Sequence, residues 1–268
     1  MSEIEYLVPD WSAPESVRAV FTLRSGGVST GPYRSLNLGA HVKDEPEAVA
    51  ENRRRVRTRF DLPAEPTWLR QVHGTDVADL DDLDASAHLA DANVAGPSSA
   101  ADAAMTRRTD RVCAIQVADC MPVLFAARDG SAVAAAHAGW RGLAAGVLEA
   151  TLDRLALPAK DVVAWLGPAI GAASFEVGDE VRAAFDGSPA SAFTRNARGR
   201  WQCDLHAIAS SRLRARGMEN IHGDPQCTYA DPARFFSFRR DGQCGRMAAL
   251  IWIDASIVGQ SNNKPPHP

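Results

Sequence analysis

The sequence lacks the features of a membrane protein, of a disulfide-rich protein and of a nucleic-acid-binding protein. No uncharged apolar run approaches the roughly 18 residues of a transmembrane helix. The five cysteines are odd in number, widely spaced and without a C-x-x-C pair, which excludes a disulfide framework. A net charge of −4 argues against a nucleic-acid surface. Because the N-terminus also has no basic and apolar leader, we expect a cytoplasmic protein that has neither nucleic acid nor a membrane as partner.

The chain has enough apolar material for one large core. It has 268 residues, of which 46% are hydrophobic, and we find neither an internal repeat nor a linker that splits it. We therefore expect a single catalytic domain over residues 1–260 and a disordered tail over 261–268. The acidic, alanine-rich stretch from Asp79 to Ala104 has the composition of a mobile surface segment. The sequence leaves the oligomeric state open.

The most informative stretch is an expected β-hairpin over residues 117–141. Two apolar runs flank Asp129–Gly130, a strong turn signal, and a two-residue turn there places Pro122 opposite His137. Side chains alternate along strands with a period of two, so Cys120 and His137 share one face at the open end of the hairpin. The hairpin therefore brings a thiol and an imidazole together.

Two chemical interpretations fit this pair, beside the possibility that both side chains are ordinary core residues. The first is a metal site, in which thiolate and imidazole are zinc ligands. The second is a cysteine nucleophile activated by a histidine base. A metal needs a third ligand, and His73 is the best placed candidate, on an expected strand over residues 67–77. Asp119 lies next to Cys120 and is a candidate proton carrier.

Two further segments offer binding groups for an anion or a polar ligand. An amphipathic helix is expected from Gly142, so its N-terminus and Arg141 lie just after the hairpin and favour a phosphate or carboxylate. Arg239 and Arg240 are alternatives for this role. A loop rich in Gly, Ser and Asn runs from Arg24 to Gly39, and it offers backbone N–H groups without the G-K-[ST] of a P-loop. The candidate substrate-binding residues are Arg24, Ser25, Gly26, Gly27, Asn37 and Gln71.

Six motifs follow one another between Leu23 and Ile253. They are R-S-G-G-V-S-T-G-P-Y-R-S-L-N-L-G-A-H-V, R-Q-V-H-G-T-D, A-D-C-M-P-V-L, A-A-H-A-G-W-R-G, L-G-P-A-I-G-A-A-S-F-E-V-G and F-F-S-F-R-R-D-G. With them the chain resembles the bacterial polyphenol oxidase or laccase-domain family, also called the purine nucleoside phosphorylase or peptidoglycan editing factor family. The resemblance implies a single α+β domain with mixed sheets in α/β/β/α layers. It also implies a zinc site formed by His73, Cys120 and His137.

The resemblance implies several activities. The number and type of possible metal ligands in the sequence favour some of them over others. A multicopper oxidase needs a cluster of many imidazoles and a separate blue-copper site, and seven histidines with no H-x-H pair do not supply that. A site of three ligands with an open fourth position suits zinc chemistry. We therefore expect a zinc-dependent purine nucleoside phosphorylase with adenosine deaminase-like activity, acting on a purine nucleoside and phosphate.

The expected catalytic residues of this enzyme are Cys120, His137, Asp119 and Arg141. One alternative is a cytoplasmic hydrolase that edits peptidoglycan precursors. Another is a copper-dependent polyphenol oxidase, since copper can replace zinc at the same Cys/His site. A protein that only binds a ligand is disfavoured by the open metal position.

Overall fold

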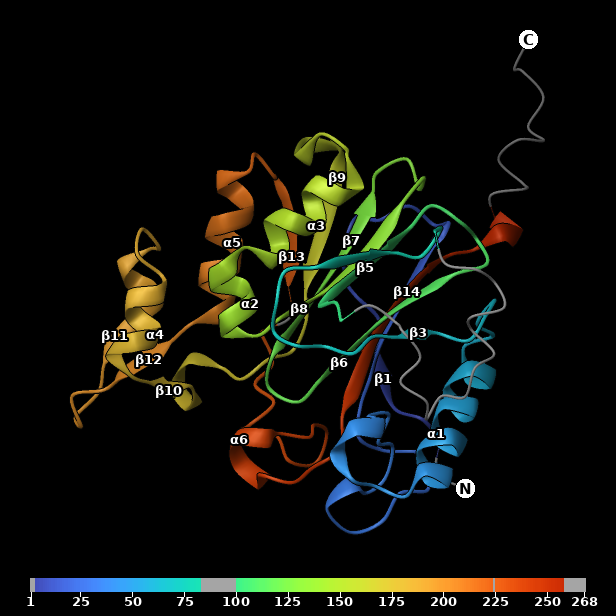
Figure 1. Cartoon of the computed structure of the whole chain (residues 1–268), viewed down its shortest axis with the longest axis horizontal. Helices are drawn as coiled ribbons and strands as arrows, with labels where there is room; N and C mark the ends of the chain where they lie inside the picture. The colour runs from blue at the N-terminus through green and yellow to red at the C-terminus, as the bar shows by residue number, and fades with distance from the viewer. Residues whose placement is uncertain (1–2, 83–99, 224, 258–268) are drawn as a thin grey trace.

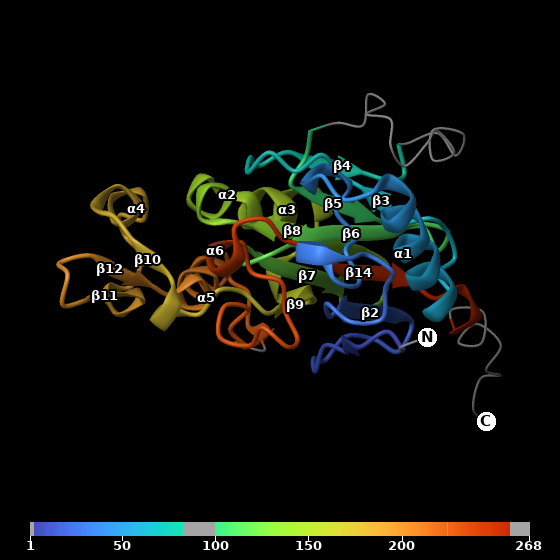
Figure 2. The ribbon, with the colours of Figure 1, turned by 90° about the horizontal axis from the view of Figure 1, so that it is seen from below.

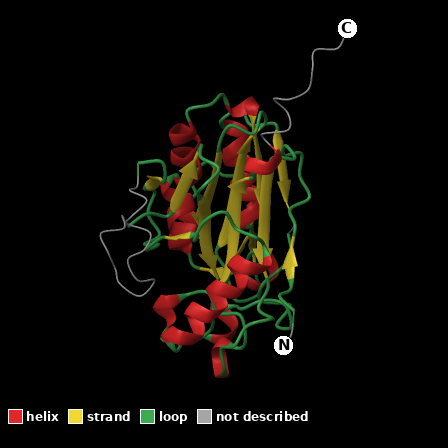
Figure 3. Ribbon diagram, turned by 90° about the vertical axis from the view of Figure 1, so that its right-hand side faces the viewer, coloured by secondary structure: helices red, strands yellow, loops and turns green. Residues whose placement is uncertain are grey.

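Two stacked β-sheets form the centre of the molecule (Figure 1). The computed structural model describes residues 3–82, 100–223 and 225–257. The first sheet has the strand order β1 (Tyr6–Leu7), β2 (Val17–Thr22), β14 (Met247–Ile253), β6 (Val112–Val117) and β3 (Thr67–Trp68). The second has the order β13 (Asn220–Gly223), β9 (Val162–Leu166), β7 (Met121–Ala127), β8 (Val133–Ala138), β5 (Ala103–Thr106) and β4 (Val77–Asp79). Figure 3 shows the long strands side by side.

Helices cover the outer faces of both sheets. They are α1 (Pro46–Arg59) on the first sheet, and α2 (Trp140–Ala145), α3 (Val147–Leu155) and α5 (Leu205–Ala215) on the second. Two shorter helices, α4 (Asp179–Ala184) and α6 (Phe238–Asp241), lie outside these layers. Short 3-10 helices are η1 (Gly31–Tyr33), η2 (Ala40–Val42), η4 (Ala159–Asp161), η5 (Ala172–Ser174) and η6 (Ala190–Ala192). In the described ranges, no helix combines the length and the apolar character needed to cross a membrane.

Three apolar clusters hold these layers together. One lies between the sheets and contains Phe21 and Leu124. The next residue along β7, Val123, faces the opposite way into a cluster with helices α3 and α5, as the alternation of a strand requires. On the other outer face, Val56 of α1 packs in a cluster with Leu250 of β14. The order is therefore helix, sheet, sheet, helix, which confirms the expected α+β fold.

A small third sheet projects from this body. It has the order β10 (Glu176–Val177), β12 (Trp201–Cys203) and β11 (Phe193–Arg195), with α4 beside it. Figures 1 and 2 both show it at the end of the molecule away from α1. The chain enters it after Phe175 and leaves it before Leu205, and the Cys203 N–H donates to the Phe175 carbonyl at 3.0 Å.

The register expected for the central hairpin is confirmed. Pro122 pairs with His137, and Leu124 pairs with Ala135. The turn itself closes slightly earlier than expected, through a hydrogen bond of 2.9 Å from the Gly130 N–H to the Ala127 carbonyl, and Gly130 has φ of 78°. The pattern of apolar runs thus fixed the pairing even though the turn has a different hydrogen bond.

Other local expectations were wrong at element boundaries. The stretch 67–77 is not one strand, because β3 ends at Trp68 and β4 begins at Val77. The stretch 79–104 ends inside the buried strand β5, while residues 83–99 and the expected tail over 261–268 lie outside the described residues. The helix expected from Gly142 begins at Trp140 and is interrupted at Gly146, whose φ is 102°.

Candidate metal centre and adjoining cavity

Three side chains from separate segments converge on one point. His73, Cys120 and His137 each offer a ligand atom, and these atoms lie within 4.8 Å of one another. The Cys120 Sγ is 3.9 Å from His73 Nε2, and the two imidazole rings have centroids 4.8 Å apart. A Cβ at Gly139 would lie 3.0 Å from the Cys120 Sγ and 2.9 Å from His73 Cδ2. Glycine therefore leaves the space that this convergence requires, and the donor set fits zinc.

The turn that carries His73 is held by a carboxylate that the sequence did not reveal. Asp102 is fully buried, and its Oδ1 accepts hydrogen bonds from His137 Nδ1 at 2.8 Å and from the His73 backbone N–H at 2.9 Å. Its Oδ2 accepts from the backbone N–H groups of Val72 and Gly74 at 3.0 and 2.7 Å. His73 has φ of 62°, so the Asp102 carboxylate stabilises a turn that L-residues rarely adopt.

Asp102 therefore orients two of the three candidate ligands at once. Burial alone would raise the pKa of its carboxyl, but the hydrogen bonds from His137, Gly74 and Val72 lower it below its usual value. An ionised carboxylate on His137 Nδ1 leaves Nε2 free to face Cys120, as in carboxylate–histidine–metal arrangements. Asp102 was missed because the surrounding sequence resembles a surface segment. The available signal was a lone Asp in A-A-D-A-A-M, directly before a strand.

Cys120 and His137 also shift each other's pKa. Burial would raise the pKa of the Cys120 thiol, but the charge and hydrogen bond of His137, with a hydrogen bond from His73, lower it instead. Burial would lower the pKa of His137, but Cys120 and Asp102 raise it. Both shifts favour a thiolate on Cys120 and an imidazolium on His137. A thiolate is the form that both a metal ligand and a nucleophile require.

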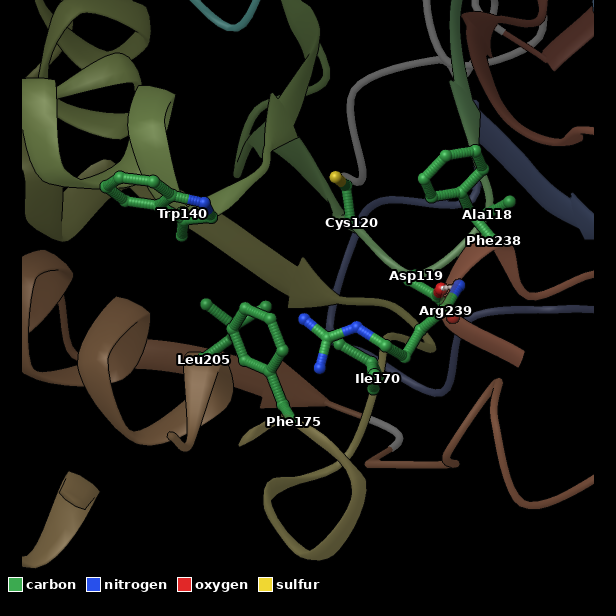
Figure 4. Close-up of a pocket in the computed structure, with 9 residues that line it drawn as sticks. All are labelled: Ala118, Asp119, Cys120, Trp140, Ile170, Phe175, Leu205, Phe238 and Arg239. Carbon is green, nitrogen blue, oxygen red and sulfur yellow. Dashed lines mark hydrogen bonds between the residues drawn. The ribbon is translucent and has the colours of Figure 1, made fainter. Parts of the chain in front are cut away.

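A cavity of about 130 Å³ opens beside Cys120 (Figure 4). Its walls are mostly apolar and include the aromatic rings of Trp140, Phe175 and Phe238. The Arg239 guanidinium lies 5.2 Å from the Phe175 ring centroid and donates to the Glu176 carbonyl at 3.0 Å. In Figure 4, this guanidinium reaches toward Phe175. The cavity thus combines flat apolar walls with one cationic group.

Asp119 holds one wall of this cavity in place. Its Oδ2 accepts from the Arg239 backbone N–H at 2.6 Å, and its Oδ1 accepts from the Thr228 hydroxyl at 2.7 Å. Its carbonyl accepts from the Ile170 N–H at 2.9 Å, and its φ is 95°. Both carboxylate oxygens are therefore engaged with the segments that form the wall. This geometry indicates a positioning residue, whereas the sequence had suggested a proton carrier.

Arg141 lies outside the cavity lining. It is exposed, and its guanidinium stacks on the Trp140 ring, 4.4 Å from the ring centroid. Arg240, the other alternative, donates to the carbonyls of Thr228, Tyr229 and Phe235 and so organises the backbone. Of these three arginines, the structure brings only Arg239 into the cavity.

The expected substrate-binding residues make mainly structural contacts. Arg24 donates to the Arg34 and Pro232 carbonyls, and the Asn37 side chain bonds the Gly39 and Arg246 backbone. Gln71 exchanges two hydrogen bonds with the Gln116 backbone. None of the six residues Arg24, Ser25, Gly26, Gly27, Asn37 and Gln71 lines the cavity beside Cys120. Their role toward substrate stays a prediction.

The two glycines of this loop have a packing role. A Cβ on Gly26 would lie 2.5 Å from the Ile4 backbone, and one on Gly27 would lie 2.2 Å from the Ser35 carbonyl oxygen. Ser25 faces a different, shallow surface hollow, which Glu3 and Arg59 also line. The density of glycine in this loop therefore reflects close backbone packing.

Comparison with known proteins covers nearly the whole chain. Residues 18–254 match the family described as multi-copper polyphenol oxidoreductase laccase. The purine nucleoside phosphorylase PA4543 of Pseudomonas aeruginosa is 50% identical over 254 residues, which cover 92% of this chain and 98% of that protein. The purine nucleoside phosphorylase YfiH of Escherichia coli is 46% identical over 250 residues, with the same coverage.

Solved structures show the same fold. The Neisseria meningitidis protein NMB0706 superposes with a TM-score of 0.85 at 44% identity, covering 93% of this chain and 99% of its own. YlmD from Geobacillus stearothermophilus has a TM-score of 0.81 at 30% identity, covering 90% and 93%.

Proposed function

Because this chain belongs to the multi-copper polyphenol oxidoreductase laccase family, and relatives bear the name purine nucleoside phosphorylase, we propose that it splits purine nucleosides with phosphate at a zinc centre. The observation that carries the proposal is the convergence of His73, Cys120 and His137 beside an aromatic cavity that contains a cation. The 50% identity to the purine nucleoside phosphorylase of Pseudomonas aeruginosa, over 92% of this chain, supports purine nucleosides as the substrate class.

The three candidate ligands suit zinc. One thiolate and two imidazoles match its preferred donors, and three protein ligands leave the open position of a catalytic site. A zinc ion held there would act as a Lewis acid toward an oxygen of the substrate or of the attacking group. Asp102 keeps the His73 turn and the His137 ring in the orientation that this requires.

The chain's own residues can then serve phosphorolysis. The reaction breaks the bond between the sugar C1′ and the base nitrogen, with positive charge on the sugar and negative charge on the leaving base. Arg239 supplies the cation for phosphate, the role that the sequence had given to Arg141. The apolar walls limit access of water, which competes with phosphate as the attacking group. Adenosine deamination in the same cavity is a secondary part of the proposal.

One observation favours a second candidate function. Cys120, His137 and Asp102 are arranged as a nucleophile, a base and an orienting carboxylate, with 2.8 Å between His137 Nδ1 and Asp102 Oδ1. This order is that of cysteine hydrolases. A hydrolase that edits peptidoglycan precursors would use it without metal. Copper-dependent phenol oxidation is a weaker candidate, because the described residues offer one three-donor cluster, too few ligands for several coppers.

Metal and product analysis of the purified protein tests this proposal. We expect about one zinc per chain, and conversion of inosine to hypoxanthine only when phosphate is present. Chelation should abolish turnover, and zinc should restore it. Activity that survives chelation but is lost on alkylation of Cys120 would favour the hydrolase. Intact nucleosides together with release of an amino acid from a muramyl-peptide precursor would replace the proposed substrate class.

A further inference from the structure

Phe238 is unusually exposed for a phenylalanine. It is 58% exposed, whereas Phe235 and Phe236, three and two residues earlier, are completely buried. Full burial of such a side chain typically stabilises a fold by about 1.5–3 kcal/mol, so exposure forgoes part of that gain. Phe238 also lines the mouth of the cavity beside Cys120. An exposed aromatic ring at a cavity mouth is typical of a ligand contact.

The backbone that carries this ring is tightly fixed. The Ser237 hydroxyl caps α6 by accepting from the Arg240 N–H, and the Gly242 N–H donates to the Phe238 carbonyl at 2.8 Å. The neighbouring Arg239 N–H is held by Asp119 at 2.6 Å. The Arg246 guanidinium also lies 5.8 Å from the Phe238 ring centroid. The ring is thus presented to solvent on a rigid support, which lowers the entropic cost of binding.

We propose that Phe238 is the stacking platform for the base of the substrate and that it favours purines over pyrimidines. This inference rests on the proposed function for the identity of the ligand. A flat base stacks on an exposed ring, and a base of two fused rings covers more of it than a base of one ring.

The arrangement on α6 places this platform next to the proposed phosphate contact. In Figure 4, the side chains of Phe238 and Arg239 diverge from adjacent residues. The single turn of α6 therefore presents the Phe238 ring and the Arg239 guanidinium in different directions. A nucleoside with its base on Phe238 leaves Arg239 available for the anion that attacks the sugar.

Substitution of Phe238 tests the platform in two independent measurements. The first is titration calorimetry with hypoxanthine alone, and the second is steady-state kinetics with inosine and with uridine. We expect Phe238→Ala to weaken hypoxanthine binding and to raise the KM for inosine about tenfold, with kcat changed less than about threefold. The effect on uridine should be smaller. Phe238→Tyr should behave like the wild type, and Phe238→Leu should fall between.

Tyr229→Ala is the matched control, because Tyr229 is also an exposed aromatic residue, at 38%, but does not line the cavity. It should leave binding and kinetics unchanged, and metal content should be equal in all variants. Hypoxanthine binding and inosine KM unaffected by Phe238→Ala would overturn the platform and leave phosphorolysis standing. Wild-type protein that binds hypoxanthine through Phe238 but turns over no nucleoside would overturn the proposed function alone. Wild-type protein that binds no base would overturn the platform.

Discussion

Two buried aspartates organise opposite sides of the site in different ways. We call His73, Cys120, His137 and Asp102 the metal corner, and Asp119, Phe238 and Arg239 the α6 wall. Asp102 is completely buried and accepts four hydrogen bonds, three of them from backbone N–H groups of one turn. The Asp119 carboxylate accepts two, from segments more than 100 residues away in sequence.

We infer from this difference that the metal corner serves the chemistry and that the α6 wall serves substrate recognition. Asp102 bonds directly to a candidate ligand, so the geometry of the metal corner depends on a single carboxylate. Asp119 bonds to the backbone of the α6 wall, whose side chains stay available to a ligand. Changes in the metal corner should therefore alter metal content, whereas changes in the α6 wall should alter substrate parameters and leave the metal in place.

Loss of a ligand should have the largest effect. Cys120→Ser replaces the thiolate with a neutral hydroxyl, and we expect zinc affinity to fall at least about 100-fold while the fold is kept, since the core is large enough to stand without this side chain. Metal analysis after dialysis, together with circular dichroism, checks both parts. Cys227→Ser is the control, because Cys227 contacts Gly171 and Ser174 outside the cluster. Stoichiometric zinc in Cys120→Ser would refute the metal corner.

Asp102→Asn should damage both the fold and the metal corner. An amide offers one acceptor oxygen and places an N–H₂ against donors, so the free energy of unfolding should fall by about 3 kcal/mol. Zinc affinity should fall about 10- to 100-fold. Urea denaturation and metal titration measure the two effects. Asp153→Asn is the control, because Asp153 is an exposed partner of Arg216 and should cost less than about 0.5 kcal/mol. Wild-type zinc affinity in Asp102→Asn would contradict the positioning role.

Arg239→Ala should affect turnover without affecting metal content. Removal of a charged contact to phosphate should reduce transition-state binding by about 2–3 kcal/mol, read as a loss in kcat/KM with saturating nucleoside and varied phosphate. Arg141→Ala should change the same parameter less than about twofold, because that side chain is exposed and stacks on Trp140. A larger loss in Arg141→Ala than in Arg239→Ala would show that Arg141 binds the anion, as the sequence had indicated.

Asp119→Asn should give the smallest effect. Asparagine keeps one acceptor oxygen for Thr228 or Arg239 but not both, so α6 should be held less firmly. We expect the KM for inosine to rise about fivefold, equivalent to about 1 kcal/mol, with unchanged zinc. Asp129→Asn at the far end of the hairpin is the control, where one backbone hydrogen bond to Ser131 is affected. Zinc loss in Asp119→Asn would show that the two sides are not separable.

Local sequence patterns predicted the hairpin correctly. The positions of Asp102 and His73 depend on contacts between distant segments, so the sequence did not predict them. The register of Pro122 with His137 follows from alternation and one turn, both readable over 25 consecutive residues of sequence. Asp102 reaches His137 because β5 pairs with β8, with Ala103 opposite Ala136, and nothing local specifies that pairing. His73 was ranked as a ligand but was placed on a strand, because its turn is stabilised by Asp102 and not by its neighbours.

The position of Arg239 at the cavity also depends on a contact between distant segments. The sequence favoured Arg141 because it follows the hairpin directly. The structure supplies the cationic group of the cavity from a segment 120 residues beyond Asp119, and a hydrogen bond from the Arg239 N–H to the Asp119 carboxylate links the two segments. The α/β/β/α layers were expected from the family resemblance, and the two stacked sheets with their helices confirm them.

The small projecting sheet is an insertion that begins and ends at nearly the same place in the fold. Its two ends, Phe175 and Leu205, both line the cavity, and the hydrogen bond from Cys203 to Phe175 closes the neck between them. Because the chain leaves and returns at nearly the same place, the intervening residues can be lengthened, shortened or exchanged without rerouting the two main sheets. Changes in this segment can therefore reshape one side of the cavity while the residues of the metal corner keep their positions.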